Sequence, residues 1–335
     1  MSNIVDILTS LGQKVDPVMI RYLKKGADTD LIPANIYQIN AGGKRVRSAL
    51  TLLSCKAAGG RISDAILPAA AIELTHNYSL IMDDIIDKGE IRRGIPIVRA
   101  KYSDDMALLV GMFYREVIED IARNCKIPKK IQDLIIYTIK ETIEGERLDI
   151  FFEQVGRPED YIVKHRFKTV SYDSYLQLIG KKTATLMRSA CQAGALAAKA
   201  SFQKEKSLIN YGWNTGLAFQ ITDDILDIFG EKTGKEIGKD IAEHKLGNAI
   251  IMYVFQEIET KSKKKLLSIL RMPKVDAKSM KKAIELIENT KAKDKAYKSA
   301  KKFANNGKKA LLTLPDSKAR RQLIELADFI VDRLY

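Results

Sequence analysis

Apolar side chains recur along almost the whole chain at steps of three and four residues, and this spacing constrains the fold more than any other feature. It is clear in segments 134–150 and 186–198, where apolar residues return to one helical face. Alternation of period two, typical of half-buried strands, is scarce. Proline occurs only 8 times, roughly half the usual frequency. The pattern predicts an all-α protein, with helices of roughly 12 to 28 residues between glycine- and proline-containing breaks.

No Ser-, Gly- or Pro-rich linker divides the chain, so we expect one helical bundle-type domain over residues 1–335. The composition changes only near the C-terminus. Residues 260–335 hold 21 basic and 8 acidic side chains, which accounts for 13 of the formal net charge of +14. Because the lysines there alternate with apolar residues, we expect amphipathic helices with solvated basic faces rather than a disordered arm.

The three cysteines, Cys55, Cys125 and Cys191, lie in separate apolar stretches without metal-binding spacing. This arrangement indicates a reduced, cytoplasmic protein. No apolar run approaches the ~20 residues of a membrane span, and the N-terminal segment lacks the features of a signal peptide. We therefore expect a soluble, unprocessed chain.

The motif DDIID occupies positions 83–87, after an apolar run from Ala69 to Met82. On a helix, Asp83 and Asp87 are one turn apart, so their carboxylates point the same way and repel each other. A cation relieves this repulsion, and Mg²⁺ suits the site because it binds one or two carboxylates together with water and phosphate oxygens. A single such pair is nevertheless more often a solvated helix face than a metal site.

A second motif with the same spacing, DDILD at 223–227, follows the apolar stretch 213–222. Both motifs end apolar segments, where a solvated face is not expected, so the two together favour metal binding. We expect two helices that face each other across a cavity and bind a polyanion through Mg²⁺.

Basic residues stand close to both motifs in the sequence. Several of them lead into a predicted helix, where backbone N–H groups and the helix dipole favour phosphate. Any one group alone is explained by a solvated helix end, but jointly they predict a site for Mg²⁺ and two separate diphosphates. The groups are 42–47 (GGKRVR), Arg92 with Arg93, 181–183 (KKT), and Lys235, Lys239 and Lys245.

Four segments then resemble the trans-isoprenyl diphosphate synthase family, and most closely its short-chain, archaeal-type geranylgeranyl diphosphate synthases. The likeness covers residues 40–250 and extends to the order and separation of the motifs. The segments are GGKRVRSAL (42–50), ELTHNYSLIMDDIIDKGEIRRGIP (73–96), YLQLIGKKTATLMRSACQAGALAA (175–198) and FQITDDILDIFGEKTGKEIGKDIAEHK (219–245).

The resemblance implies the isoprenoid synthase fold, a helical bundle around a central active-site cavity, and three Mg²⁺ ions that hold an allylic diphosphate. It also implies a homodimer. The metal ligands would be Asp83, Asp87 and Asp223, supported by Asp84, Asp224 and Asp227.

The same resemblance assigns the substrate-binding residues. One set would hold the allylic diphosphate: Arg92, Lys182 and Lys235. Another would bind isopentenyl diphosphate: Lys44, Arg47, His76 and Arg93. Lys245 is also expected to bind substrate. Thr183 and Gln220 would line the reacting carbons and, with Lys182, take part in catalysis. A lone histidine on an apolar helix is usually a core residue, but His76 lies two turns before Asp83 on the same face, so we favour the ligand role.

Two residues just before the first motif are expected to set the product length. Tyr78 and Ser79 lie five and four positions before Asp83. In the family, an aromatic residue at the first of these positions without a second at the next resembles the C20-producing pattern. We therefore predict geranylgeranyl diphosphate as the product, with Tyr78 as the floor of the pocket; farnesyl and longer products are the alternatives. The alternative is that Tyr78 is ordinary core packing.

The chain departs from the usual family pattern at several positions, among them Arg99, Met112 and Glu146, where His, Asp and Gln are usual. None of these changes removes a predicted ligand, but Arg99 and Glu146 alter the charge near the cavity and leave substrate preference open.

Three other functions are compatible with parts of the sequence. A class I terpene cyclase also uses an aspartate-rich helix, but it has no isopentenyl diphosphate for a GGKR turn to bind. A non-catalytic synthase subunit commonly loses one aspartate motif, and here both are intact. A nucleic-acid partner is not expected, because no aromatic stacking platform accompanies the lysines. At most a weak attraction of the Lys-rich part to anionic lipid is expected.

Overall fold

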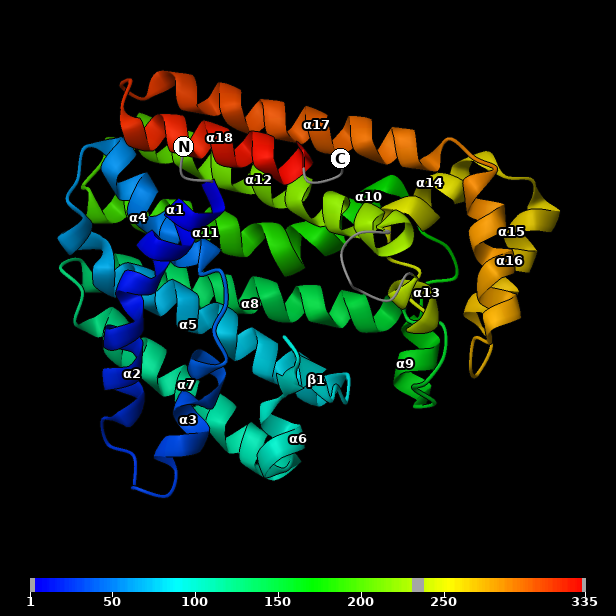
Figure 1. Cartoon of the computed structure of the whole chain (residues 1–335), viewed down its shortest axis with the longest axis horizontal. Helices are drawn as coiled ribbons and strands as arrows, with labels where there is room; N and C mark the ends of the chain where they lie inside the picture. Colours follow the sequence, from blue (N-terminus) through cyan, green and yellow to red (C-terminus); the bar gives the residue numbers. More distant parts are fainter. Residues whose placement is uncertain (1–3, 231–237, 333–335) are drawn as a thin grey trace. The chain divides into compact units, whose positions relative to one another are not determined.

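The protein is almost entirely helical in a computed structural model that describes residues 4–230 and 238–332 (Figure 1). The elements are α1 (Ile4–Gly12), the 3₁₀ turn η1 (Gln13–Val15), α2 (Asp16–Lys24), α3 (Ile32–Asn40), α4 (Val46–Ala58), α5 (Ile62–Ile86), β1 (Ile91–Arg92), β2 (Ile95–Pro96), α6 (Val98–Tyr102), α7 (Asp104–Arg123), α8 (Pro128–Phe152), α9 (Asp160–His165), α10 (Tyr172–Ile179), the π-helical turn η2 (Gly180–Ala184), α11 (Thr185–Ala197), α12 (Phe202–Phe229), α13 (Lys239–Ala242), α14 (Ala249–Glu257), α15 (Thr260–Leu270), α16 (Ala277–Glu288), α17 (Ala292–Ala310), the 3₁₀ turn η3 (Leu311–Thr313) and α18 (Lys318–Asp332).

These elements form two compact units. The first comprises Met1–Thr142, Thr185–Gly212 and Lys308–Leu326, and the second comprises Ile143–Ala184, Trp213–Gly307 and Ala327–Tyr335. The prediction of an all-α fold is confirmed. The prediction of one domain over the whole chain stays a prediction.

In the first unit, α5 packs against α4, α7 and α11 (Figure 1). Small residues allow these helices to approach closely. A Cβ atom at Gly194 of α11 would lie 2.2 Å from the backbone oxygen of Thr51 in α4, a distance that no side chain tolerates. α5 is buried on most sides between Pro68 and Thr75, which explains why this segment is largely apolar. This packing fixes the helix whose end carries the first aspartate motif.

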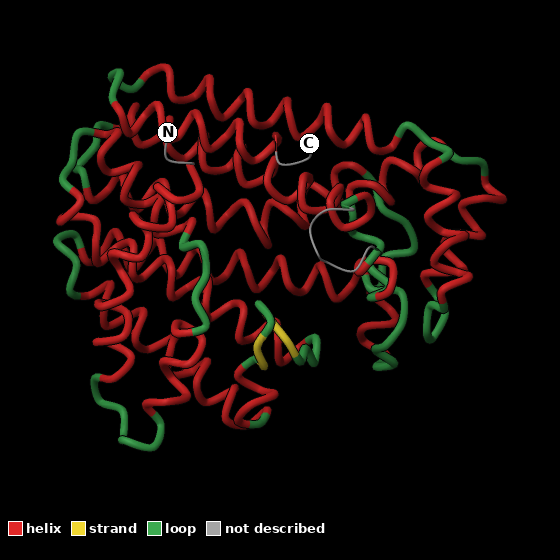
Figure 2. Tube along the Cα trace, in the orientation of Figure 1, coloured by secondary structure: helices red, strands yellow, loops and turns green. Residues whose placement is uncertain are grey.

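The one sheet among the described residues is a two-stranded antiparallel hairpin that follows α5, coloured yellow in Figure 2. Arg93 and Gly94, at its turn, have φ angles of +55° and +78°, which gives the twist that a two-residue hairpin requires. From the sequence we expected only a glycine- and proline-containing break between helices here. The hairpin is a finding of the structure, because two residues per strand are too few for a periodic signal.

In the second unit, the N-termini of α10 and α14 are capped by side chains. Ser171 and Ser174 form a capping box on α10, and the Asn248 side chain accepts hydrogen bonds from Ile250 N and Ile251 N. The Lys-rich segment forms amphipathic helices as predicted. In α15, for example, Leu266, Ile269 and Leu270 are buried.

The three cysteines are buried free thiols. None of the described helices is long and apolar enough to cross a membrane.

Candidate active site

The first aspartate motif lies at the C-terminal end of α5, and its three carboxylates have different surroundings. Asp84 is buried, with 7% of its surface exposed, whereas Asp83 is half-buried and Asp87 is exposed. Asp84 accepts a hydrogen bond of 2.7 Å from Arg92 Nη2. Successive helix positions are about 100° apart, so Asp83 and Asp84 point in different directions. Asp84 thus binds Arg92 in this structure. A role of Asp84 in metal binding stays a prediction.

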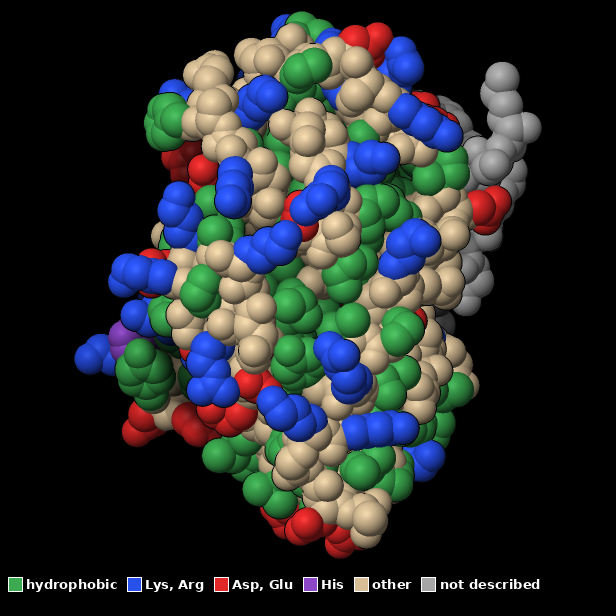
Figure 3. All heavy atoms as spheres, turned by 90° about the vertical axis from the view of Figure 1, so that its left-hand side faces the viewer, with side chains coloured by type: hydrophobic (Ala, Val, Ile, Leu, Met, Phe, Trp, Pro, Cys, Tyr) green, Lys and Arg blue, Asp and Glu red, His purple; other side chains and the backbone are tan. Residues whose placement is uncertain are grey.

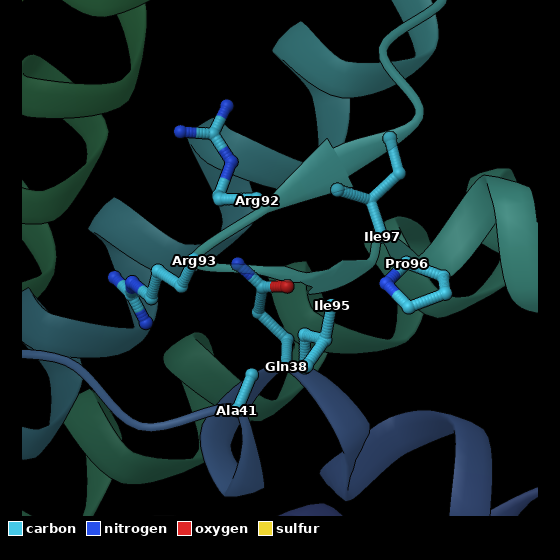
Figure 4. Close-up of a pocket in the computed structure, with 7 residues that line it drawn as sticks. All are labelled: Gln38, Ala41, Arg92, Arg93, Ile95, Pro96 and Ile97. Atoms are coloured by element: carbon cyan, nitrogen blue, oxygen red, sulfur yellow. The ribbon is translucent and has the colours of Figure 1, made fainter. Parts of the chain in front are cut away.

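The β1–β2 hairpin carries Arg92 and Arg93 back towards the start of α4. The guanidinium of Arg93 donates a hydrogen bond to the backbone oxygen of Gly42 and lies against Gly43. Gly43 has a φ of +141°, a backbone conformation that favours glycine. A Cβ there would lie 2.8 Å from Arg93 Nη1, so the flexible end of Arg93 would have to shift. Figure 4 shows Arg92 and Arg93 diverging from the hairpin, with Gln38 of α3 reaching between them. The small pocket that they line has a volume of about 10 Å³, roughly room for one water molecule.

Arg45, at the N-terminus of α4, is buried and holds the turn together. Its Nε donates a hydrogen bond of 2.8 Å to Asp16 Oδ1, and its Nη2 donates another to the backbone oxygen of Ile39. Its φ of +48° is left-handed, which is uncommon for a residue with a side chain. Arg45 therefore shapes the basic turn, while Lys44 is exposed and Arg47 is half-buried.

His76 lies among these arginines. Part of its ring reaches the surface, but its Nδ1 atom is inaccessible and has no hydrogen-bond partner among the described residues. Burial, followed by the positive charges of Arg47, Arg93, Arg92 and Arg45, lowers the pKa of His76 well below its usual value. His76 is therefore neutral near pH 7, and four guanidinium groups act on one site.

The two residues predicted to set product length lie on α5 between His76 and Asp83. Tyr78 and Ser79 are both half-buried. The hydroxyl of Ser79 donates a 2.9 Å hydrogen bond to the backbone oxygen of His76. Their proposed role in product length stays a prediction.

In the second unit, the second motif belongs to α12, and Asp224 is its most enclosed member, with 3% of its surface exposed. Tyr175 Oη donates a hydrogen bond of 2.6 Å to Asp224 Oδ2, and Gln220 Nε2 donates one of 2.9 Å to Asp224 Oδ1. The backbone N–H of Ala249 supplies a third. Asp224 therefore fixes its neighbours, and its contribution to metal binding stays a prediction; Asp223 and Asp227 are half-buried.

The same network reaches the predicted catalytic residues. Thr183, on η2, donates a hydrogen bond of 2.7 Å to Gln220 Oε1. Gln220 in turn donates a hydrogen bond to Asp224, one helical turn later. The structure thus brings Thr183, Gln220 and Asp224 into one connected array within the second unit.

Carboxylates crowd this end of α12. Burial, and then the charge of Asp240, raises the pKa of Asp227 to about 7 and raises that of Asp224 well above its usual value. Burial likewise raises the pKa of Asp240. Such shifts arise where buried acidic groups repel one another, and a bound divalent cation would relieve the repulsion. The donor set therefore fits a divalent metal ion.

Lys182 and Lys245 both contact Asp149, a carboxylate that the sequence did not assign. Lys182 Nζ lies 2.6 Å from Asp149 Oδ2, and Lys245 Nζ lies 3.5 Å from the same oxygen. Lys182 Nζ is also 2.7 Å from Glu146 Oε2, but the alignment is too poor for a hydrogen bond, so this contact is ionic. Asp149 was missed because a lone Asp within a helix carries no spacing signal, although Glu146 drew attention as a departure from the family.

Two predicted features remain to be placed. Lys235 lies outside the described residues. Among the described residues, no group of three or more ligating side chains is close enough to hold a metal by itself. Mg²⁺ does not need one, because it usually takes one or two carboxylates and completes its shell with water and phosphate oxygens.

The comparisons with known proteins now identify the relationship. The family described as polyprenyl synthetase matches residues 30–287. The chain belongs to this family. It is therefore a transferase that elongates trans-prenyl diphosphates, and members of the family typically use Mg²⁺.

Individual relatives agree with this placement. The chain is 35% identical over 338 residues to a short chain isoprenyl diphosphate synthase from Methanothermobacter thermautotrophicus, with 99% of each covered. It is 34% identical to a (2E,6E)-farnesyl diphosphate synthase from Mycobacterium bovis, over 72% of this chain and 65% of that one. The structure is also similar to geranylgeranyl pyrophosphate synthetase from Pyrococcus horikoshii, with a TM-score of 0.89, 32% identity and 98% of each chain covered. These relatives differ in product, so they leave the product length open.

Proposed function

We propose that this synthase condenses isopentenyl diphosphate head-to-tail with dimethylallyl, geranyl or farnesyl diphosphate and releases geranylgeranyl diphosphate. The observation that carries the two-substrate reaction is the cluster of arginines around neutral His76, two of which, Arg47 and Arg93, are not assigned to the allylic diphosphate. Such a concentration of positive charge suits an anion that is separate from the one bound through the aspartates. Isopentenyl diphosphate is that second anion, with Lys44, Arg47, His76 and Arg93 as its ligands.

The remaining residues bind and ionise the allylic diphosphate. When bound, Mg²⁺ would supply charge stabilisation for the leaving diphosphate; we infer three ions, for which each aspartate motif would provide ligands. We also assign binding of the allylic diphosphate to Arg92, Lys182, Lys235 and Lys245. The oxygens of Thr183 and Gln220 face the developing allylic cation.

The carbon–carbon bond forms when the π electrons of isopentenyl diphosphate attack this cation. One proton is then lost, and the departing diphosphate accepts it. This explains why no side chain stands out as a general base. His76 is neutral, so we assign it a hydrogen bond to isopentenyl diphosphate rather than proton transfer.

The proposed reaction is tested by incubating the purified chain with labelled allylic diphosphate and Mg²⁺, with and without isopentenyl diphosphate. Elongated products that require both substrates are expected. Turnover of the allylic diphosphate alone to a hydrocarbon would indicate a terpene cyclase and overturn the proposal. No turnover under any condition would point to a non-catalytic subunit.

Product length is tested at Tyr78. Replacing Tyr78 with Ala removes the proposed floor of the pocket, so products longer than C20 are expected when chain length is read by chromatography. Ser79→Phe is the matched change in the opposite sense. It places a large side chain one position closer to Asp83, so the pocket becomes shallower and the product should shorten towards C15. An unchanged product distribution in both variants would show that Tyr78 is ordinary core packing.

We also infer that the protein is a homodimer. Leu108, Leu109 and Met112 on α7 are 46%, 53% and 60% exposed, and Ile136 on α8 is 40% exposed. The two helices are neighbours, since Gln132 donates a hydrogen bond to Glu119. Apolar side chains gathered in this way indicate a contact surface, and a second copy is the proposed occupant. Light scattering that gave the mass of one chain at micromolar concentration would contradict the inference.

A further inference from the structure

Three turns lie together at one end of the first unit. Lys204 Nζ, at the start of α12, donates a hydrogen bond of 3.2 Å to the backbone oxygen of Ala58 at the end of α4. Ser207 and Thr313 share a hydrogen bond between their hydroxyls, which joins α12 to η3. A Cβ at Gly60 would touch Ala198. We call the surface formed by residues 56–61, 198–206 and 309–321 the turn face.

The turn face is strongly basic. Its only acidic residues are Glu205 and Asp316, and both are engaged, Glu205 by the amide of Gln192 and Asp316 by Arg321. Five exposed lysines have no ion-pair partner among the described residues: Lys56, Lys199, Lys206, Lys309 and Lys318. Figure 3 looks onto this end of the molecule and shows basic side chains spread over it, with hydrophobic ones between them.

Two large apolar side chains project from the turn face. Phe202 is 80% exposed and Leu312 is 64% exposed. Phe202 begins α12 and Leu312 lies in η3, so each sits at a turn and packs little against its own helix. Single exposed apolar residues are common. Two such residues on adjacent turns of a surface that also carries exposed lysines need an explanation.

We propose that the turn face docks on an anionic lipid bilayer. The lysines complement the negative headgroups, and Phe202 and Leu312 insert into the boundary between headgroups and acyl chains. A lipid surface fits better than nucleic acid, because the two apolar side chains are isolated tips and offer no stacking platform. The turn face is also a better docking surface than the Lys-rich helices α15 and α16, because the apolar residues of these helices are buried in packing.

The proposal is tested by sedimentation of the full chain with vesicles of phosphatidylcholine alone or mixed with phosphatidylglycerol. Each lysine near an anionic surface strengthens binding about fivefold. We expect binding only to the mixed vesicles. The combined change Lys199→Glu, Lys206→Glu and Lys318→Glu should weaken it at least about 100-fold, and Phe202→Ser with Leu312→Ser about tenfold.

In a matched control variant, three exposed lysines of the C-terminal helices are replaced with Glu: Lys261, Lys264 and Lys282. This variant should retain most of the binding. All substituted side chains are exposed, and circular dichroism melting curves verify that each variant is folded. Failure of the unaltered chain to bind, equal binding to both vesicle types, or an equal loss in the control variant would overturn the proposal. The readout is binding alone, so these outcomes leave the prenyl-transfer proposal untouched.

Discussion

Replacing Asp83 with Asn is expected to lower kcat/KM for prenyl transfer about 10³-fold. The amide keeps the size of the side chain but removes the negative charge that, in the proposed mechanism, holds Mg²⁺ against the leaving diphosphate. Metal ions supply several kcal/mol of charge stabilisation in such reactions, and about 4 kcal/mol corresponds to a 10³-fold change in rate. Steady-state kinetics with both substrates measure the effect. The Mg²⁺ concentration for half-maximal rate should also rise, because one ligand is weakened.

The exposed residue Asp105, on α7, provides the control for charge alone. Asp105→Asn removes the same charge from the same unit and should leave kcat/KM within about twofold of the unaltered enzyme. If Asp83→Asn behaves like Asp105→Asn, Asp83 is not a metal ligand and the first motif is a solvated helix end.

Replacing Asp149 with Asn is expected to destabilise the protein by about 3 kcal/mol at neutral pH. Asp149 has 7% of its surface exposed and is the carboxylate on which both Lys182 and Lys245 converge. Removing one partner of such a buried pair leaves the remaining charges poorly compensated. Burial alone would raise the pKa of Asp149, but the charges of Lys182 and Lys245 outweigh it and lower that pKa to about 2.

The sign of the pH dependence follows from this shift. Since the pKa of Asp149 is lower in the folded than in the unfolded chain, the unfolded chain binds more protons in acid. The contribution of Asp149 to the free energy of unfolding is therefore fully present above about pH 4. It is lost as the pH falls towards 2, by about 2 kcal/mol in total. Denaturant unfolding at pH 7 and pH 3 measures it. The Asn variant should lose less stability between these pH values than the unaltered chain.

The exposed residue Asp133 serves as the comparison for Asp149, because it lies on the same helix, α8. Asp133→Asn should change the free energy of unfolding by less than about 0.5 kcal/mol. Equal effects at the two positions would show that the Lys182–Asp149 and Lys245–Asp149 pairs contribute nothing measurable.

Most of the fold was predictable because helices have a strong periodic signal. The three- and four-residue spacing predicted the all-α class, and the alternation of lysines with apolar residues predicted amphipathic C-terminal helices, which α15 bears out. The β1–β2 hairpin and the π-helical turn η2 were not predicted. A strand of two residues has no period to detect, and a π turn depends on the packing of the helices on either side rather than on local propensity.

For the candidate site, the sequence determined which chemistry is present, and the tertiary structure decided what each group touches. Two DDxxD spacings and the basic turns predict binding of metal ions and diphosphate, because side chains at i and i+4 share a helical face whatever surrounds them. The engagement of Asp84 with Arg92, of Asp224 with Tyr175, and of Lys182 with Asp149 joins residues 8 to 49 positions apart. Such contacts depend on how helices pack, and no local spacing encodes them.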